Sequence, residues 1–328
     1  MKVLVTGANG FLGSWLTRRL IELGHDVSII ARSSSDLSEL DGLEYKKLIG
    51  DVTDLPSLEK AFRGQDTIFH LAGVIAYKAA DRPLMEKANV QGTANVVSAM
   101  KNASVHDLVY LSSVVAIGAG FSQHEVLNEN SPYNIHHLNL GYFETKHEAE
   151  KIVKAATGHE LRSVILNPST IYGAGDAKKG SRKMQIKVAR HELPFYTPGG
   201  VNVVAVEDVI DGLLAAWKKG RSGERYILAG DNLLIKDLFA QIAEAAGVPA
   251  PQIQMPSFLL HGLGFLGDQA AHLGLKAPFS GENAWTSTLF HWFDNSKAKA
   301  ELGFQPRPSA EAIRQSVQWM REKGYLNK

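Results

Sequence analysis

A phenol and an ammonium near the middle of the chain have the spacing of an acid–base pair. Tyr142 and Lys146 are four residues apart, so on a helix they share one face. An unperturbed phenol has a pKa of about 10, and a neighbouring ammonium favours its ionised form. Such a phenol can donate a proton to a carbonyl oxygen, or accept one in the reverse direction. Taken alone, the same pair is also typical of the exposed face of an ordinary amphipathic helix.

Two adjacent hydroxyls offer a second group for the same chemistry. Ser112 and Ser113 follow the apolar run 108–111, which predicts a strand. A hydroxyl at the carboxyl end of a strand can hydrogen-bond a carbonyl oxygen and polarise it. The alternative is that both hydroxyls satisfy the local backbone.

A glycine-rich turn near the start of the chain can hold a dinucleotide. It joins the apolar strand 2–6 to a helix. Gly7 allows a sharp turn, Gly10 lets a pyrophosphate approach the backbone, and Gly13 lets the helix pack closely on the strand. The helix N-terminus then offers N–H groups and the positive end of its dipole to the phosphates. The predicted cofactor contacts of this turn are Gly7, Asn9, Gly10, Phe11, Leu12 and Gly13.

Strand and helix patterns alternate through the first half of the chain. Apolar runs predict strands at 27–30, 45–48, 67–71, 108–111 and 163–166, with helices around 55–62, 83–101 and 139–156. This alternation predicts a parallel sheet covered by helices on both faces. The expected fold class is α/β: a Rossmann-type doubly wound parallel sheet with a smaller, mostly helical C-terminal substrate lobe.

The pattern changes after residue 171, which sets the predicted domain boundary. Residues 1–171 are predicted to form the dinucleotide-binding domain, with 201–219 returning to it as a strand at 203–206 and a helix at 207–218. Residues 172–200 and 220–328 are predicted to form the substrate lobe. The cleft is expected between the two parts, at the carboxyl ends of the strands.

The glycine spacing, with Thr6 before it and Tyr-x-x-x-Lys downstream, resembles the extended branch of the short-chain dehydrogenase/reductase superfamily, also called the NAD-dependent epimerase/dehydratase family. Further motifs resemble this branch in the same order, over essentially the whole chain. They are Asp51-Val52, His70-Leu71-Ala72-Gly73, Asn89-Val90-Gln91-Gly92-Thr93 and Asn167-Pro168-Ser169-Thr170-Ile171-Tyr172-Gly173.

The resemblance implies roles for individual residues. The superfamily's catalytic serine or threonine matches Ser113 rather than Ser112, so Ser113 would polarise the carbonyl. Tyr142 would be the acid–base group, and Lys146 would lower the pKa of the phenol and hold the nicotinamide ribose. The implied cofactor contacts beyond the glycine turn are Asp51, Val52, Leu71, Ala72, Gly73, Asn89, Tyr142, Lys146, Asn167, Pro168 and Ser169.

The end of the second predicted strand bears on the choice of cofactor. An NAD enzyme usually has an acidic residue there for the ribose 2′-hydroxyl. This chain has Arg32 and Ser33, and Asp36 lies further along. Arg32 can stack on adenine and pair with a 2′-phosphate, and Ser33 can add a hydrogen bond. We therefore favour NADP(H) over NAD(H), the alternative being an arginine exposed on a loop.

Composition excludes several other classes of protein. The 328 residues carry a formal net charge of +1 and no basic run, so nothing suggests nucleic-acid binding. Cysteine is absent, and the histidines show no metal-ligand spacing, so no metal is expected. The apolar stretch 258–266 is too short to span a membrane, and no leader precedes the first strand, so we expect a cytoplasmic protein. The resemblance also implies a possible homodimer.

The substrate is expected to be a small, hydrophobic carbonyl compound. The stretch before Val203 lacks the cation typical of relatives that bind sugar diphosphates. This stretch and the segment 294–304 resemble dihydroflavonol-reductase-like and hydroxysteroid-dehydrogenase-like proteins, whose bacterial relatives include hopanoid-associated sugar epimerases. The lobe is rich in Phe, Leu and Trp, most of which are expected in the core, while some can line a pocket for a hydrophobic ketone. Lys178, Lys179, Arg182 and Lys183 are expected in a solvated loop, the alternative being that they bind a phosphate group.

The predicted function is NADP(H)-dependent reduction of a ketone or aldehyde to an alcohol. One alternative is an NAD-dependent nucleotide-sugar epimerase or dehydratase that uses the same three residues. A second is a dinucleotide-sensing regulator without catalysis, in which Ser113, Tyr142 and Lys146 would be expected to have degraded; here all three are present.

Overall fold

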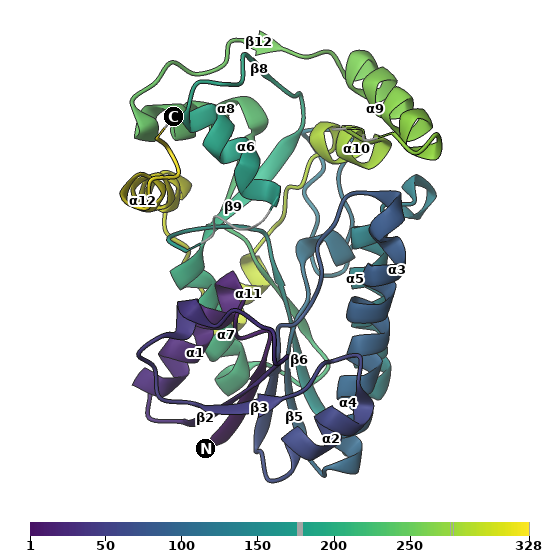
Figure 1. The fold of residues 1–328 in the computed structure, drawn as a ribbon, viewed down its shortest axis with the longest axis vertical. Helices are drawn as coiled ribbons and strands as arrows, with labels where there is room; N and C mark the ends of the chain where they lie inside the picture. Colours follow the sequence, from purple (N-terminus) through teal and green to yellow (C-terminus); the bar gives the residue numbers. More distant parts are fainter. Residues whose placement is uncertain (176–179, 276, 278, 328) are drawn as a thin grey trace.

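A seven-stranded parallel sheet forms the lower half of the molecule in Figure 1. The computed structural model describes residues 1–175, 180–275, 277 and 279–327. The strand order is β10-β6-β5-β4-β1-β2-β3, and every neighbouring pair is parallel. The strands are β1 (Lys2–Thr6), β2 (Asp26–Ala31), β3 (Lys46–Ile49), β4 (Thr67–His70), β5 (Asp107–Leu111), β6 (Arg162–Pro168) and β10 (Arg225–Leu228).

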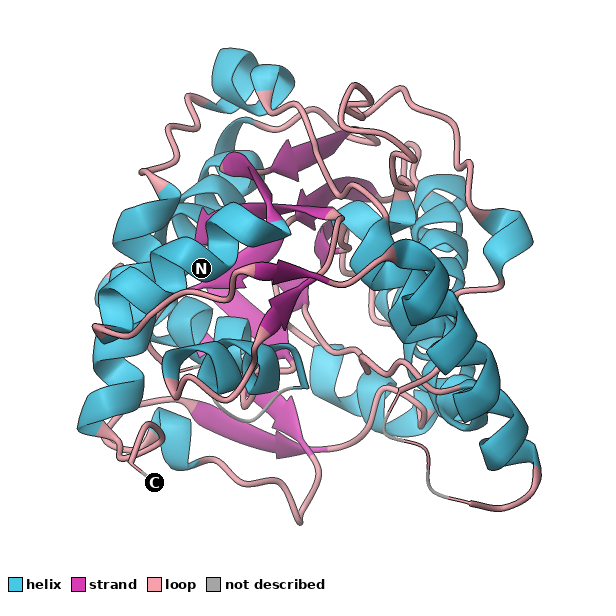
Figure 2. Cartoon of the chain, turned by 90° about the horizontal axis from the view of Figure 1, so that it is seen from above, coloured by secondary structure: helices cyan, strands magenta, loops and turns pink. Residues whose placement is uncertain are grey.

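Helices cover both faces of this sheet, as Figure 2 shows from above. On one face α1 (Phe11–Glu22), α7 (Val206–Lys219) and α11 (Ser296–Leu302) bury residues such as Leu16 and Leu213. On the other, α2 (Leu55–Phe62), α4 (Gly92–Asn102) and α5 (Gly141–Ala156) bury residues such as Phe62 and Met100. The inner strands are therefore apolar on both sides, and the predicted doubly wound fold is confirmed.

The predicted helix 83–101 is present but changes its winding. It begins as α3 (Arg82–Met85), passes through a π-helical segment at Glu86–Gln91, and continues as α4. Such π segments often occur at functional sites because they turn a side chain out of register with its helix. Here the segment carries Asn89, one of the predicted cofactor contacts.

The upper half of Figure 1 consists of shorter strands and helices. A second sheet has the order β11-β9-β7 and a third pairs β12 with β8. The strands are β7 (Thr170–Tyr172), β8 (Phe195–Tyr196), β9 (Gly200–Ala205), β11 (Asp231–Leu234) and β12 (Ile253–Gln254). The helices are α6 (Gly180–Ala189), α8 (Ile235–Ala246), α9 (Ser257–His272), α10 (Gly281–Thr288) and α12 (Ser309–Glu322). Short 3-10 turns lie at Ser38–Leu40, Ala79–Asp81, Val114–Ala116 and His136–Leu138.

Two strands lie in a different sheet from the one predicted. The strand expected to rejoin the main sheet, β9, pairs instead with β7 and β11, because Val201 and Val203 pack against α8 and α12. The strand at 225–228, expected in the lobe, forms the edge of the main sheet beside β6, where Tyr226 and Leu228 join its core. The helix at 206–219 does cover the main sheet. The division into a cofactor domain and a substrate lobe stays a prediction.

None of the helices among the described residues has the length and apolar character needed to cross a bilayer. The most apolar helix, α9, leaves Phe258, Phe265 and Leu266 more than half exposed and buries Leu260. The composition of the lobe suggested core positions for these residues; Leu260 is in the core, and the other three are not.

Candidate active site

The predicted site residues all lie along one edge of the main sheet. They follow the carboxyl ends of β6, β5, β4, β1, β2 and β3, which are neighbours in that order. The edge from β6 to β2 spans four strand spacings, about 19 Å. Ser113, Tyr142 and Lys146 belong to the β5–β6 end, the glycine turn to the centre, and Arg32 to the β2 end. An extended dinucleotide lying along this edge would therefore meet the residues in the predicted order.

The glycine turn has the geometry that its sequence predicts. Gly7 has φ +72°, and a Cβ there would lie 2.7 Å from the backbone nitrogen of Ala72. A Cβ on Gly13 would lie 2.8 Å from the Cα of Ala8. At Gly10 a Cβ would meet only the oxygen of Gly7, at 3.3 Å, so internal packing does not account for this glycine.

The first turn of α1 also fits a phosphate group. Its N-cap residue, Gly10, has no side chain that could accept a hydrogen bond from the N–H groups of the turn. These N–H groups and the positive end of the helix dipole are suited to an anion. Asn9 beside them is exposed, whereas Leu12 is buried in the core and Phe11 is half-buried.

A buried histidine connects the glycine turn to the loop after β4. His70 is fully buried, with Nδ1 2.8 Å from Thr6 Oγ1 and Nε2 3.2 Å from Thr93 Oγ1. Thr93 donates its only hydroxyl proton to the carbonyl of Asn89, so it must accept from His70 Nε2–H. Burial lowers the pKa of His70 to about 3, which keeps the ring neutral. The sequence motif that contains His70 does not by itself indicate this connecting role.

The loop after β4 lies beside the glycine turn. Leu71 and Ala72 donate their backbone N–H groups to Thr6, and Gly73 lies close to the side chains of Asn89 and Lys146. Asn89 is buried, and its amide bonds Val74 N–H, Val74 O and Thr145 Oγ1 at 2.8, 2.9 and 3.1 Å. Its side chain thus ties the loop to α5, which is an indirect way to shape a cofactor site.

Tyr142, Lys146 and Ser113 come together at the end of β5. Tyr142 and Lys146 are one turn apart on α5, and both are less than a tenth exposed. Lys146 Nζ donates to the carbonyl of Leu111 at 2.8 Å and lies 5.3 Å above the ring of Tyr110. Ser113 is the N-cap of the short turn after β5, and its side chain hydrogen-bonds that of Tyr142. Ser112 instead points to the buried carboxylate of Glu150, at 2.8 Å.

The acidity of Tyr142 differs from the expectation based on Lys146. Burial raises the pKa of the phenol above its usual value, and the neighbouring Tyr77 adds to the rise. The hydrogen bond with Ser113 acts in the opposite direction because it favours the phenolate. The chain by itself therefore holds Tyr142 as a protonated phenol at neutral pH, ready to donate.

The surroundings of Tyr142 are apolar. Its ring packs in a cluster with Met85, Ala119, Ile135, Leu140, Phe143 and Leu289, against which Val74, Ala76, Val115 and Trp285 also pack. Tyr77 makes an edge contact with Tyr142, at 6.3 Å between ring centroids. These residues come from the loops after β4 and β5, from α5 and from α10, so only the folded chain assembles them.

Helix α10 closes the site from above. Ser280 at its start donates to the carbonyl of Tyr77 at 2.9 Å. Glu282 in its first turn accepts a hydrogen bond of 3.4 Å from the backbone N–H of Gly141, where α5 begins. The upper half of the molecule thus contacts both the loop after β4 and the helix that carries Tyr142.

The residues predicted for the adenine end lie at the surface. Arg32 and Ser33 are exposed directly after β2. Asp36 lies further along, and its carboxylate accepts the N–H of Ser38 at 3.0 Å. Asp51 accepts hydrogen bonds from the N–H and hydroxyl of Thr53, and Val52 packs against the core beneath α4. The tip of β2 thus carries a basic side chain and no acidic one.

The motif after β6 is mostly buried. Asn167 donates from Nδ2 to Ser113 O and to Glu150 Oε2, and Pro168 pairs with β10. The hydroxyl of Ser169 lies 2.5 Å from Asn202 Oδ1 and is therefore satisfied within the protein. Any contact of these residues with the cofactor would have to come from other atoms of the turn.

The basic segment expected to be a solvated loop is partly in the core. Lys178 and Lys179 lie outside the described residues. Arg182 on α6 is 2% exposed, donates to the carbonyl of Ile171 and lies 4.1 Å from the ring centroid of Tyr172. For Arg182 the prediction was wrong, because its guanidinium packs inward, whereas Lys183 is exposed as expected.

Comparison with known proteins agrees with this geometry. One relative is the "Putative dihydroflavonol 4-reductase" of Synechocystis, 31% identical over 98% of this chain and 95% of that protein. Another is sterol demethylase protein B of Methylococcus capsulatus, 29% identical over 99% of this chain and all of that protein. Among solved structures, the nucleoside-diphosphate-sugar epimerase PA4631 of Pseudomonas aeruginosa superposes with a TM-score of 0.81. It is 27% identical, over 100% of this chain and 99% of that one.

Residues 3–229 match the NAD dependent epimerase/dehydratase family. This match covers more than half of the chain and includes every residue predicted for the site. The chain therefore belongs to the NAD-dependent epimerase/dehydratase family, within the extended short-chain dehydrogenases/reductases, and is an NAD(P)-dependent oxidoreductase.

Proposed function

We propose that this protein reduces the carbonyl group of an apolar small molecule, with NADPH as the reductant. The observation that carries the proposal is the position of Tyr142, buried in an apolar cluster, hydrogen-bonded to Ser113 and one turn from Lys146. A buried phenol that keeps its proton is suited to donate it to an oxygen that becomes negative.

The chain's residues would act in a simple order. Ser113 hydrogen-bonds the substrate carbonyl and polarises it, and Tyr142 gives its proton to the oxygen as negative charge develops. When bound, the nicotinamide supplies the hydride. Lys146 holds the ribose hydroxyls, and its positive charge favours the phenolate that remains after proton transfer. The reverse order oxidises an alcohol.

The substrate class follows from what surrounds Tyr142. The side chains that pack around it are aliphatic and aromatic, and the cation of Lys146 lies one turn away on α5. A sugar diphosphate carries charges that would be poorly compensated there, and burying them would cost several kcal/mol. Two relatives bear the names of a dihydroflavonol reductase and a sterol demethylase protein. Neither name refers to a sugar diphosphate.

The choice of NADPH rests on Arg32. Its guanidinium is exposed at the tip of β2, where it can pair with a 2′-phosphate, while Asp36 is turned toward Ser38. An acidic residue at the tip would instead have favoured the 2′-hydroxyl of NAD.

A nucleotide-sugar epimerase with NAD is the second candidate. It is favoured by the similarity to a nucleoside-diphosphate-sugar epimerase structure, which extends over the whole chain. Both functions need Ser113, Tyr142 and Lys146, so only the substrate and the cofactor separate them.

The test is to measure oxidation of NADPH and NADH with a panel of ketones, aldehydes and nucleotide sugars. The same preparation is titrated calorimetrically with UDP, GDP and dTDP-sugars after loading with NADP⁺. We expect turnover of apolar carbonyl compounds with NADPH and diphosphate binding no tighter than millimolar. Micromolar binding of a nucleotide sugar, with sugar epimerisation and no net NADPH consumption, would establish the epimerase instead. Tight dinucleotide binding with no turnover of any compound would favour a regulator.

A further inference from the structure

A buried carboxylate lies directly below the predicted catalytic residues. Glu150 is on α5, one turn after Lys146 and two turns after Tyr142, and it is 3% exposed. Neither the predicted mechanism nor the sequence motifs assign it a role. Its place on the same helix as the phenol, and its burial, make its partners informative.

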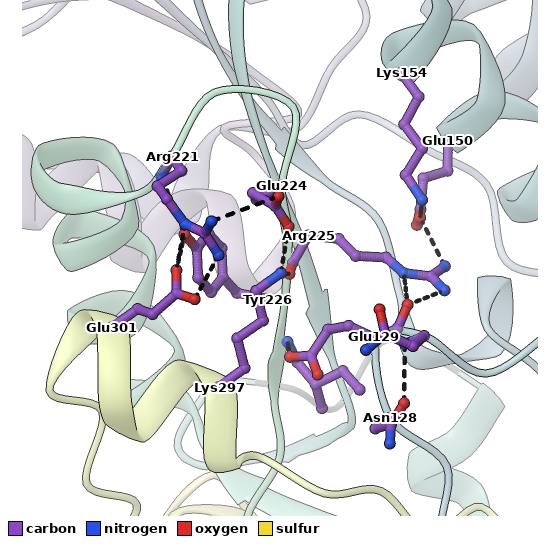
Figure 3. A network of polar contacts seen from close by, with 12 residues as sticks. Asn128, Glu129, Glu150, Lys154, Arg221, Glu224, Arg225, Tyr226, Lys297 and Glu301 are labelled. Atoms are coloured by element: carbon purple, nitrogen blue, oxygen red, sulfur yellow. Dashed lines mark hydrogen bonds and ion pairs between the residues drawn. The ribbon is translucent and has the colours of Figure 1, made fainter.

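The two oxygens of Glu150 have different partners. Oε2 accepts hydrogen bonds from Ser112 Oγ at 2.8 Å and from Asn167 Nδ2 at 2.7 Å. Oε1 lies 3.1 Å from Arg225 Nη1 and 3.2 Å from Lys154 Nζ. Figure 3 shows Arg225 reaching from its strand toward Glu150, with Lys154 above it on the helix. One oxygen thus contacts the strand ends beneath the active site, and the other contacts cations.

Asn167 extends this connection to Ser113. Its Nδ2 donates both to Glu150 Oε2 and to the backbone carbonyl of Ser113, at 2.9 Å. A flipped amide would place Oδ1 against these two acceptors, so the hydrogen bonds determine its orientation. The carbonyl of Ser113 is therefore connected to Glu150 on α5 through two consecutive hydrogen bonds, both donated by Asn167. Its neighbour Ser112 is connected to Glu150 directly, through its side chain.

We propose that Glu150 is a positioning residue that holds Ser113 at hydrogen-bonding distance from Tyr142; this inference rests on the proposed function. Tyr142 belongs to α5, whereas Ser113 belongs to a short turn after β5. Apolar contacts between the helix and the sheet are non-directional, so they do not by themselves fix the distance between the two hydroxyls to a fraction of an ångström. The hydrogen bonds of Glu150 to residues after β5 and on β6 fix that distance, together with those of Lys146 to Leu111 O and of His147 to Ala116 O.

The ionised form of Glu150 is required for this arrangement. Arg225 and Lys154 favour the carboxylate, and they hold the pKa of Glu150 below its usual value despite burial. A carboxylate can accept all four hydrogen bonds, whereas glutamine has only one acceptor oxygen. In Glu150→Gln the amide NH₂ must face either Ser112 and Asn167 or the two cations. The variant keeps the side-chain shape and disrupts one of the two sets.

The experiment compares Glu150→Gln with Ser112→Ala and with a matched control. The control is Glu301→Gln on α11, which removes a carboxylate that accepts hydrogen bonds from Arg221 and Tyr226 (Figure 3). Neither of these partners is Ser112, Ser113 or Tyr142. In the full-length protein with NADPH and a carbonyl compound that the parent reduces, kcat of Glu150→Gln should fall roughly 10- to 100-fold, since small misplacements of reacting groups have effects of this size. KM for NADPH should change less than threefold.

The pH profile distinguishes positioning from a general loss of stability. The hydrogen bond from Ser113 favours the phenolate of Tyr142, so weakening it should move the rise of alcohol oxidation with pH to higher pH. We expect this shift in Glu150→Gln, a smaller one in Ser112→Ala, and none in Glu301→Gln. A parent-like kcat and pH profile in Glu150→Gln, or equal losses in Glu301→Gln, would overturn the proposal. If Glu150→Gln does not fold, Ser112→Ala decides by the same criteria.

A measurement without substrate separates this inference from the proposed function. The amides of Val115 and Ala116 donate to the side chain and carbonyl of Ser113. Their hydrogen exchange should accelerate at least tenfold in Glu150→Gln and remain unchanged in Glu301→Gln. If the parent reduces no carbonyl compound, the proposed function fails, and exchange alone then decides whether Glu150 holds Ser113. Unchanged exchange in Glu150→Gln would refute that role.

Discussion

The substitution Tyr142→Phe tests the proposed chemistry directly because it removes one oxygen atom and keeps the ring. The ring packs among Met85, Leu140 and Leu289, and phenylalanine can fill the same space. The cost to folding is then the hydrogen bond with Ser113, about 0.5–1.5 kcal/mol. For a chain of this length that corresponds to a fall in Tm of about 1–2 °C.

Catalysis should respond far more strongly than stability to the same change. Without a proton donor, kcat should drop roughly 10²- to 10⁴-fold, which corresponds to about 3–5 kcal/mol of transition-state stabilisation. The two effects therefore differ by several kcal/mol in one variant. The assay is NADPH oxidation at saturating carbonyl substrate, with thermal melting of the same preparation.

The pH dependence of the parent supports the same test. Reduction needs the protonated phenol, and burial raises the pKa of Tyr142, so kcat for reduction should stay flat between about pH 6 and 9 and fall at higher pH. Alcohol oxidation needs the phenolate and should rise with pH over the same range. A Tyr142→Phe variant that turns over at a near-normal rate would show that Tyr142 is not the proton donor. An unfolded variant would contradict the packing argument.

Three further predictions concern the cofactor site and the core. Arg32→Ala should weaken NADPH binding by about 1–3 kcal/mol and NADH binding much less. Titration of both proteins with both cofactors checks this; equal weakening would mean that Arg32 only stacks on the adenine and does not bind the 2′-phosphate. Gly13→Ala should destabilise the fold by about 1–3 kcal/mol, because its Cβ meets the Cα of Ala8 at 2.8 Å. Its control Gly262→Ala, with no atom within 4 Å, should stabilise α9 by about 0.5–1 kcal/mol in urea unfolding. His70 stays neutral when folded, with a pKa of about 3. The contribution of the neutral His70 to the free energy of unfolding is complete above the unfolded pKa of about 6.5 and is lost as the pH falls toward 3. The free energy of unfolding should therefore fall by about 1.4 kcal/mol between pH 8 and 5.5. A free energy of unfolding that does not change over that interval would contradict it.

Local spacing was enough to predict the cofactor turn and the pair on α5. A strand, three glycines and a helix can form essentially one kind of turn, so Gly7 and Gly13 occupy the positions expected. Tyr142 and Lys146 share a helix face because four residues make about one turn. The alternation of apolar strands and helices likewise predicted a doubly wound sheet, since only helices on both sides can bury such strands.

Contacts between distant segments could not be predicted in the same way. Which sheet β9 and β10 join depends on packing against α8, α12 and α7, and no local pattern encodes it. Arg182 looked like a solvated charge, yet it packs on Tyr172 because α6 folds back over β7. The raised pKa of Tyr142 and the four partners of Glu150 arise from side chains on separate strands, loops and helices. Burial and hydrogen bonding depend on all of these neighbours at once, so only the tertiary structure decides the protonation and the alignment of the groups that the sequence identifies.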